Sequence, residues 1–149
     1  MKPRPELRWR SWWLAARMAA WVAVLRLGVR GVSVTRLVRF VEPRKTTTVA
    51  HERDISRIVA LSQRVTAALA DRPETLCLVR SLVAYRYLIR AGVRPELRVG
   101  FERPGSALRG HAWVELDGAP VTDDHGAVAG MTTTLAFRPG GSGPTDGLH

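Results

Sequence analysis

The chain has 149 residues, of which 46% are hydrophobic and 24% charged, so it is long enough for one domain with a buried core and leaves little for a second. This composition, with five Trp, excludes wholesale disorder, and the single Cys excludes an intramolecular disulfide framework and favours a reducing compartment. The formal net charge of +10 raises nucleic acid or an anionic membrane as a partner.

The positive charge is concentrated at one end of the chain. Residues 1–45 contain 11 Arg or Lys and two acidic residues, whereas residues 46–149 contain 12 basic and 11 acidic residues. The near-neutral remainder argues against nucleic acid as the main ligand. The most apolar stretch, Ser11 to Val29, is interrupted by Arg17 and Arg26, which argues against both a membrane-spanning helix and a signal peptide. We therefore expect a cytoplasmic, unprocessed chain.

Two helices are predicted in the basic part. Glu6 to Leu27 lacks Pro and Gly and is rich in Ala, Leu and Arg. A short second helix follows between Ser33, a suitable N-cap, and Pro43, which ends it. These helices either pack on the core or dock an acidic partner or a membrane surface through their basic, Trp-bearing faces. Helical spacing relates Trp9, Trp13, Ala16, Ala20, Val24 and Leu27 in the first helix, and Val34, Leu37, Val38 and Val41 in the second.

Two more helices are predicted after a connector at residues 44–48. The third covers His51 to Ala70. Asp71 to Glu74 form an N-terminal signal for the fourth helix, which runs to Arg90 and is capped by Gly92. Apolar residues occupy nearly every side of this fourth helix, a pattern typical of a helix surrounded by protein.

Strands are predicted beyond Gly92, because the apolar period changes there from 3.6 to 2. One strand covers 97–102 and another covers 111–117. Asp117-Gly118 then predicts a tight hairpin that returns over 120–123. A last strand is predicted over 132–137.

The order of elements predicts an α+β protein with one domain over residues 1–137. Residues 1–45 form its basic helical part and residues 46–137 its core. Residues 138–149 are rich in Gly and Pro and are predicted to be a disordered tail.

Cys77 is expected within the first turn of the fourth predicted helix. A free Cys is most often a small buried hydrophobic residue. The first turn of a helix, however, offers unpaired N–H groups and the positive end of the helix dipole, which favour a thiolate over a thiol. A cysteine nucleophile also needs a base and a group that orients the base. His111 and the pair Asp123 and Asp124 lie on the two arms of the predicted hairpin.

The geometry of the turn decides which Asp lies on the same face as His111. With a strict two-residue turn at Asp117-Gly118, Asp124 is opposite His111 and Asp123 points to the other face. A three-residue turn or one bulge instead puts Asp123 on the face of His111. Local geometry alone leaves both registers open.

Several segments resemble the transglutaminase-like leader peptidases of lasso-peptide biosynthesis. The resemblance covers roughly residues 71–125 and has Cys, His and Asp in the chain order of that family. It implies a papain-like core in which a buried Cys-bearing helix packs on a small antiparallel sheet. It also favours Asp123 over Asp124, and hence the bulged or three-residue turn. The matching segments are Thr75-Leu76-Cys77-Leu78-Val79-Arg80, Leu88-Ile89-Arg90-Ala91-Gly92, His111-Ala112-Trp113-Val114-Glu115-Leu116-Asp117-Gly118 and Val121-Thr122-Asp123.

The resemblance implies a cysteine protease that removes the leader from a ribosomally made precursor peptide without a cofactor. In that family Cys77 would be the nucleophile, His111 the base and Asp123 the residue that orients the base. The chain is similar to the stand-alone form of this enzyme, whose precursor-recognition domain is a separate protein. The implied partners are therefore the precursor, the recognition protein and the ATP-dependent cyclase.

Two details of the site follow from the residues around it. We expect the oxyanion donors to be backbone N–H groups at the start of the Cys77 helix, with Gln63 as a weaker alternative. Trp113 lies on the face of His111 by strand alternation. It either packs in the core or forms a wall of the cleft that contacts substrate.

Three alternatives remain. Asp123, Asp124, His125 and His111 could converge on a metal, but adjacent strand residues point apart and the spacing is irregular, so we predict no metal and place His125 in a turn. The chain could instead be a non-enzymatic basic adaptor that binds an acidic partner, an anionic membrane or nucleic acid, with Cys77 inert. Finally, an amine could replace water as the acyl acceptor, which would make the reaction an amide transfer.

Overall fold

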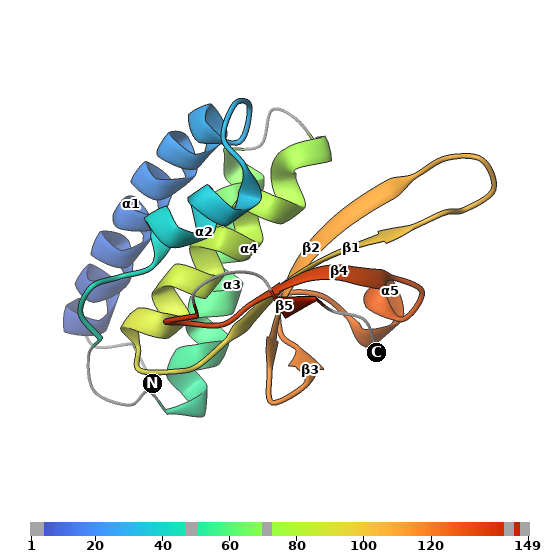
Figure 1. Cartoon of the computed structure of the whole chain (residues 1–149). Helices are drawn as coiled ribbons and strands as arrows, with labels where there is room; N and C mark the ends of the chain where they lie inside the picture. The colour runs from blue at the N-terminus through green and yellow to red at the C-terminus, as the bar shows by residue number, and fades with distance from the viewer. Residues whose placement is uncertain (1–4, 47–50, 70–72, 142–144, 147–149) are drawn as a thin grey trace.

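The computed structural model describes residues 5–46, 51–69, 73–141 and 145–146. In this part of the chain, the first four helices gather on one side of the molecule, and the sheet and the short last helix lie on the other (Figure 1). The fold is therefore α+β, as predicted. The helices are α1 (Pro5–Gly28), α2 (Val34–Val41), α3 (Glu52–Ala68), α4 (Pro73–Arg90) and the short α5 (His125–Val128); the strands are β1 (Glu96–Glu102), β2 (Arg109–Leu116), β3 (Ala119–Pro120), β4 (Thr132–Phe137) and β5 (Thr145–Asp146).

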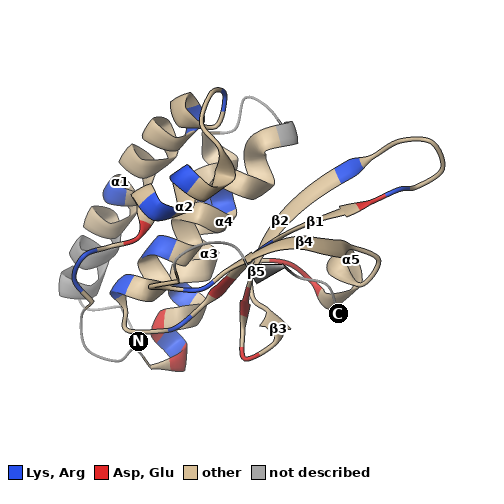
Figure 2. Ribbon diagram, viewed as in Figure 1, with Lys and Arg blue, Asp and Glu red and all other residues tan. Residues whose placement is uncertain are grey.

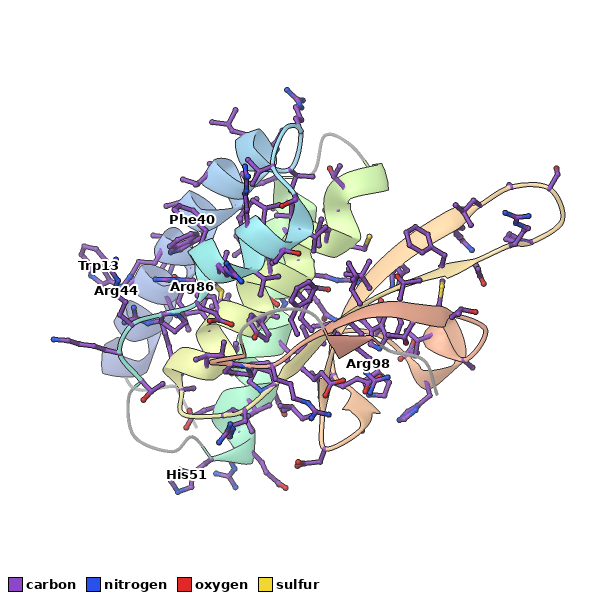
Figure 3. The ribbon with its side chains drawn as sticks, in the orientation of Figure 1. Trp13, Phe40, Arg44, His51, Arg86 and Arg98 are labelled. Carbon is purple, nitrogen blue, oxygen red and sulfur yellow. The ribbon has the colours of Figure 1, made fainter. Side chains whose placement is uncertain are left out.

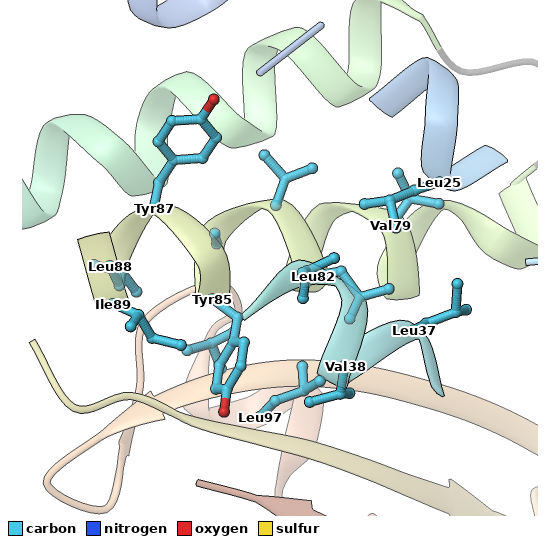
Figure 4. Packing of buried hydrophobic residues seen from close by; sticks show 14 of the residues in the cluster. Leu25, Leu37, Val38, Val79, Leu82, Tyr85, Tyr87, Leu88, Ile89 and Leu97 are labelled. Carbon is cyan, nitrogen blue, oxygen red and sulfur yellow. The ribbon is translucent and has the colours of Figure 1, made fainter. Parts of the chain in front are cut away.

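Helix α4 forms the centre of the core and contacts α1, α2, α3, β1 and β2. Its residues Leu82, Tyr85 and Leu88 are completely buried, and apolar side chains of α1, α2 and β1 converge on it (Figure 4). The Tyr85 hydroxyl donates a hydrogen bond to Glu42 at 3.2 Å, and burial, together with that carboxylate, raises the pKa of Tyr85 far above its usual value. The prediction of a helix surrounded by protein is confirmed.

The buried face of α1 is not the apolar stripe noted in the sequence. Met18, Val22 and Leu25 are at most 1% exposed, whereas Trp13 is 58% and Leu27 is 76% exposed. Both sets repeat at intervals of three or four residues, because α1 is apolar on most of its circumference, so periodicity cannot choose between them. None of the helices in the described ranges is long and apolar enough to cross a membrane.

The five strands found in the described residues form one antiparallel sheet in the order β3-β2-β1-β4-β5. The last residues of β1 and the first residues of β2 pair with each other and extend beyond the helices as a two-stranded arm (Figure 1). The predicted disordered tail is wrong at Thr145 and Asp146, which form β5 because the outer edge of β4 offers backbone groups for pairing. Residues 142–144 and 147–149 lie outside the described residues.

The hairpin between β2 and β3 has a strict two-residue turn. Asp117 and Gly118 have φ values of 50° and 81°, the pair of positive angles typical of a type I′ turn. Leu116 pairs directly with Ala119 across this turn. The bulged or three-residue turn favoured by the family resemblance is therefore wrong.

Asp123 nevertheless reaches His111, because the β-ladder ends before it. Val121 N donates to Val114 O at 2.8 Å, as the strict register requires, but Val114 N donates to the Thr122 side-chain Oγ1 at 2.9 Å. Strand alternation therefore stops at Thr122, and a bend turns Asp123 toward His111.

The residues after this bend form a helix where a turn was expected. Asp124 is exposed and occupies the N-cap position of α5, and His125 is the first residue of that helix. The expected place of His125 in a turn is therefore wrong, since four residues complete one helical turn here.

Substituting Gly100 tests the packing beneath His111. Gly100 pairs with His111 across the β1–β2 ladder, and an added Cβ would lie 2.8 Å from Thr132 O and 3.0 Å from the Trp113 ring. We expect Gly100→Ala to lower the free energy of unfolding by about 1–3 kcal/mol, as overpacking does, measured by urea denaturation. Gly126→Ala is the matched control, because its Cβ would meet nothing within 4 Å. Equal effects of the two changes would contradict this reading.

Substituting Thr122 tests the end of the ladder. Thr122→Val keeps the shape of the side chain but leaves the Val114 N–H buried without an acceptor, so we expect a loss of about 1–3 kcal/mol in the free energy of unfolding. Thr122→Ser retains the hydroxyl and should lose less. If the Val variant is as stable as the Ser variant, the Thr122 hydroxyl does not hold this bend.

Candidate active site

A cavity of about 680 Å³ lies between the first half of α4 and β2. Cys77 from α4, His111 from β2 and Asp123 from the bend after β3 all line it. Cys77 is a free cysteine that is partly exposed where it lines the cavity. The structure thus brings the three residues singled out in the sequence to one place.

The imidazole of His111 is held by Asp123. His111 Nε2 lies 3.1 Å from Asp123 Oδ1. An ionised carboxylate only accepts hydrogen bonds, so this contact favours the tautomer with a proton on Nε2 and leaves Nδ1 as the acceptor. Among the described residues no hydrogen bond joins Cys77 to His111. Catalytic contacts are often long in the free enzyme and shorten when substrate binds.

The Asp123 carboxylate is fully satisfied. Arg80 Nη2 donates to its two oxygens at 2.6 and 2.8 Å, and Thr122 Oγ1 donates to Oδ2 at 3.0 Å. The Asp123 side chain is only 9% exposed, so these bonds are largely shielded from water. Arg80 from α4, His111 from β2 and Thr122 from the bend therefore fix the orientation of this carboxylate.

Arg80 is the residue of the site that the sequence analysis did not single out. It follows Cys77 by three residues, which puts both side chains on one face of α4. The sequence does contain a signal for Arg80. It is a charged residue in a helix that is apolar on nearly every side, and a charge in such a place needs a partner.

Trp113 supports the His111 ring and does not contact the cavity. The two rings stack with their centroids 6.2 Å apart and an interplanar angle of 18°. The indole Nε1 donates to Glu115 Oε1 at 2.8 Å, and the residue is 2% exposed. Trp113 is not among the residues that line the cavity. Of the two roles that the sequence left open for Trp113, its covered ring fits packing in the core and not a wall of the cleft.

The structure removes one of the backbone groups that could have held the oxyanion. Cys77 is the fifth residue of α4, beyond the first turn, and an α-helix pairs the amide of its fifth residue with the carbonyl of its first. The Cys77 amide is therefore already used. Gln63 Nε2 donates to Thr122 O at 3.1 Å, so Gln63 supports the bend next to Asp123, and it is not among the residues that line the cavity. The predicted helix start at Asp71 lies outside the described residues.

No group of three or more His, Cys, Asp or Glu side chains in the described ranges could hold a metal ion. Asp124 and His125 are exposed, whereas Asp123 is bound to Arg80 and His111. These three neighbours therefore do not converge on one point.

Comparison with known proteins places this geometry in a family. The model of the transglutaminase-like superfamily matches residues 18–136, which include Cys77, His111 and Asp123. No curated protein and no solved structure matches the chain. Because the family model covers most of the sequence, the chain belongs to the transglutaminase-like superfamily.

Proposed function

We propose that this protein is a cysteine peptidase that removes the leader from a ribosomally made lasso-peptide precursor. The observation that carries the proposal is that Cys77, His111 and Asp123 line the same cavity, with His111 Nε2 3.1 Å from Asp123 Oδ1. The resemblance of the segments around Cys77 and His111 to lasso leader peptidases supports the choice of substrate.

The mechanism gives Cys77, His111 and Asp123 different roles. His111 Nδ1 accepts the proton of Cys77, and Cys77 Sγ attacks the carbonyl carbon of the scissile bond. The protonated His111 then gives this proton to the leaving amine, which is the new N-terminus of the core peptide, and a thioester joins the leader to Cys77. Water, deprotonated by His111, hydrolyses the thioester and releases the leader carboxylate. Throughout these steps Asp123 keeps the His111 ring in place.

The helical side of the molecule provides a surface for the recognition protein. Trp12 and Trp13 on α1 are 71% and 58% exposed, and Phe40 on α2 is 57% exposed. Figure 3 shows Trp13, Phe40 and Arg44 at this side of the molecule, and Figure 2 shows Lys and Arg on α1 and α2. Exposed Trp beside positive charge suits a partner with an apolar, acidic surface.

The proposal is tested by incubating the protein with a candidate precursor, with and without the recognition protein, and by identifying the products by mass spectrometry. We expect one cut that separates leader from core, slow for the isolated chain and faster with the recognition protein, because that partner raises the effective concentration of substrate. An added amine should not appear on the leader. A transamidated leader would favour amide transfer, and an uncut precursor would favour the non-enzymatic adaptor.

Substitutions test the roles of the site residues in the same assay. Cys77→Ala and His111→Ala should abolish cleavage with the fold intact, and Asp123→Ala should lower kcat by about 10²-fold or more. Asp124→Ala is the matched control, since Asp124 is adjacent but exposed at the start of α5, and it should cleave like the unsubstituted protein. Loss of activity in Asp124→Ala with retention in Asp123→Ala would refute the assignment.

A further inference from the structure

The outer edge of β2 is open where it meets the active-site cavity. β2 runs from Arg109 to Leu116, but β3 pairs only with Glu115 and Leu116. In the described part of the chain, no strand pairs with the outer edge of β2 between residues 109 and 113. An edge of this kind presents backbone N–H and C=O groups to an incoming strand.

The hydrogen bonds of Val114 identify the backbone groups that point to this edge. Val114 O accepts from Val121 N and Val114 N donates to Thr122 Oγ1, so both groups point to the β3 side. In an antiparallel ladder every second residue directs its two backbone groups to the same side. Ala112 and Gly110 therefore direct their backbone groups to the open edge as well.

One of these four groups is already used. Ala112 O accepts a hydrogen bond from Ser81 Oγ of α4 at 2.8 Å. The Ala112 N–H and the N–H and C=O of Gly110 have no partner among the described residues. Two donors and one acceptor therefore remain at the spacing of a β-ladder. Gly110 is exposed, whereas Ala112 is buried and reaches solvent only where it lines the cavity.

The open edge forms a wall of the cavity that contains Cys77. Gly110 and Ala112 line the cavity together with Cys77 and His111. Gly110 has no side chain that could shield its backbone from an approaching chain. A peptide paired with this edge would therefore pass directly beside the catalytic sulfur.

Apolar side chains form much of the rest of the cavity, beside Arg80 and Arg109. Leu76 and Leu78 flank Cys77 on α4, and Val99 and Leu108 belong to β1 and to the loop before β2. Alternate residues of an added strand point to the same side, so every second side chain of a bound peptide would meet these walls. Arg109 at the end of the edge is paired with Glu102 at 2.9 Å.

We propose that the precursor segment next to the cleaved bond binds as an extra strand on the open edge of β2, through the backbone of Gly110 and Ala112, with its alternate side chains in the apolar part of the cavity. This inference rests on the proposed peptidase function. Main-chain bonds provide the affinity of such strand addition, and pockets for alternate side chains provide its specificity. The substrate class is therefore an extended segment with apolar residues at every second position.

The first test is a set of synthetic precursors, each with one backbone nitrogen methylated near the cleaved bond. N-methylation removes a donor and blocks strand pairing. We expect kcat/KM to fall about tenfold or more at every second residue and to change little at the residues between, because only alternate residues face β2. Equal tolerance at all positions would overturn the strand proposal while the peptidase function stands.

A pair of substitutions tests the same edge from the enzyme side. Gly110→Pro removes the outward N–H, whereas Gly110→Ala keeps it, and both add a Cβ that would lie 3.0 Å from the Phe101 ring. The difference between them therefore isolates the amide. We expect kcat/KM of the Pro variant to be about tenfold below that of the Ala variant, with circular dichroism spectra alike. Equal kcat/KM values would count against the edge.

Hydrogen exchange separates a failure of this inference from a failure of the function. The full-length Cys77→Ala protein is mixed with the unmodified precursor and the recognition protein, and amide exchange is followed by NMR. We expect slower exchange at Gly110 and Ala112 when the precursor is present. Cleavage without this protection overturns strand addition alone. Protection without cleavage by the unsubstituted protein overturns the peptidase function alone, and the absence of both overturns both.

Discussion

The contact between Arg80 and Asp123 is the interaction on which the site depends. It joins α4 to the bend after β3, two segments that are 43 residues apart in the chain. Arg80 lies one helical turn from Cys77, so the bond that fixes Asp123 also fixes which side of α4 faces β2. Ser81 adds a second link in the same region through Ala112 O. The sulfur and the imidazole are therefore positioned by the packing of α4 on the sheet, and not by a contact between them.

The shared carboxylate also limits what Asp123 can contribute to the proposed reaction. Its two oxygens carry one negative charge, and Arg80 lies within 2.8 Å of both. A positive charge at that distance offsets much of the attraction that Asp123 would exert on a protonated His111. The role of Asp123 is then mainly geometric: it holds the Nε2 proton, directs Nδ1 away from itself and fixes the ring plane against Trp113. Arg80 in turn keeps the buried carboxylate satisfied, which a single His could not do.

The sequence predicts an element correctly where its residue pattern is compatible with one structure only. The apolar circumference of α4, the change of period after Gly92 and the Asp117-Gly118 turn each predicted the observed element. The prediction failed where two solutions were equivalent. The two apolar stripes of α1 could not be told apart by spacing, and strand alternation could not reveal that a Thr hydroxyl would end the ladder at Thr122. Arg80 was missed because its partner is distant in the chain, and pairings of that kind are set by tertiary packing.

The early end of the β2–β3 ladder has two consequences that arise from the same few residues. If β3 continued in register, Asp123 would point away from His111, and its backbone would cover the outer edge of β2. The Thr122 hydroxyl replaces the next backbone acceptor, so the chain leaves the ladder after Val121 and turns toward α5. This departure brings Asp123 to His111 and at the same time leaves the outer edge of β2 without a paired strand at Gly110 and Ala112, which line the cavity with Cys77. The geometry of the candidate site and the unpaired strand edge are therefore coupled: a longer β3 would remove both.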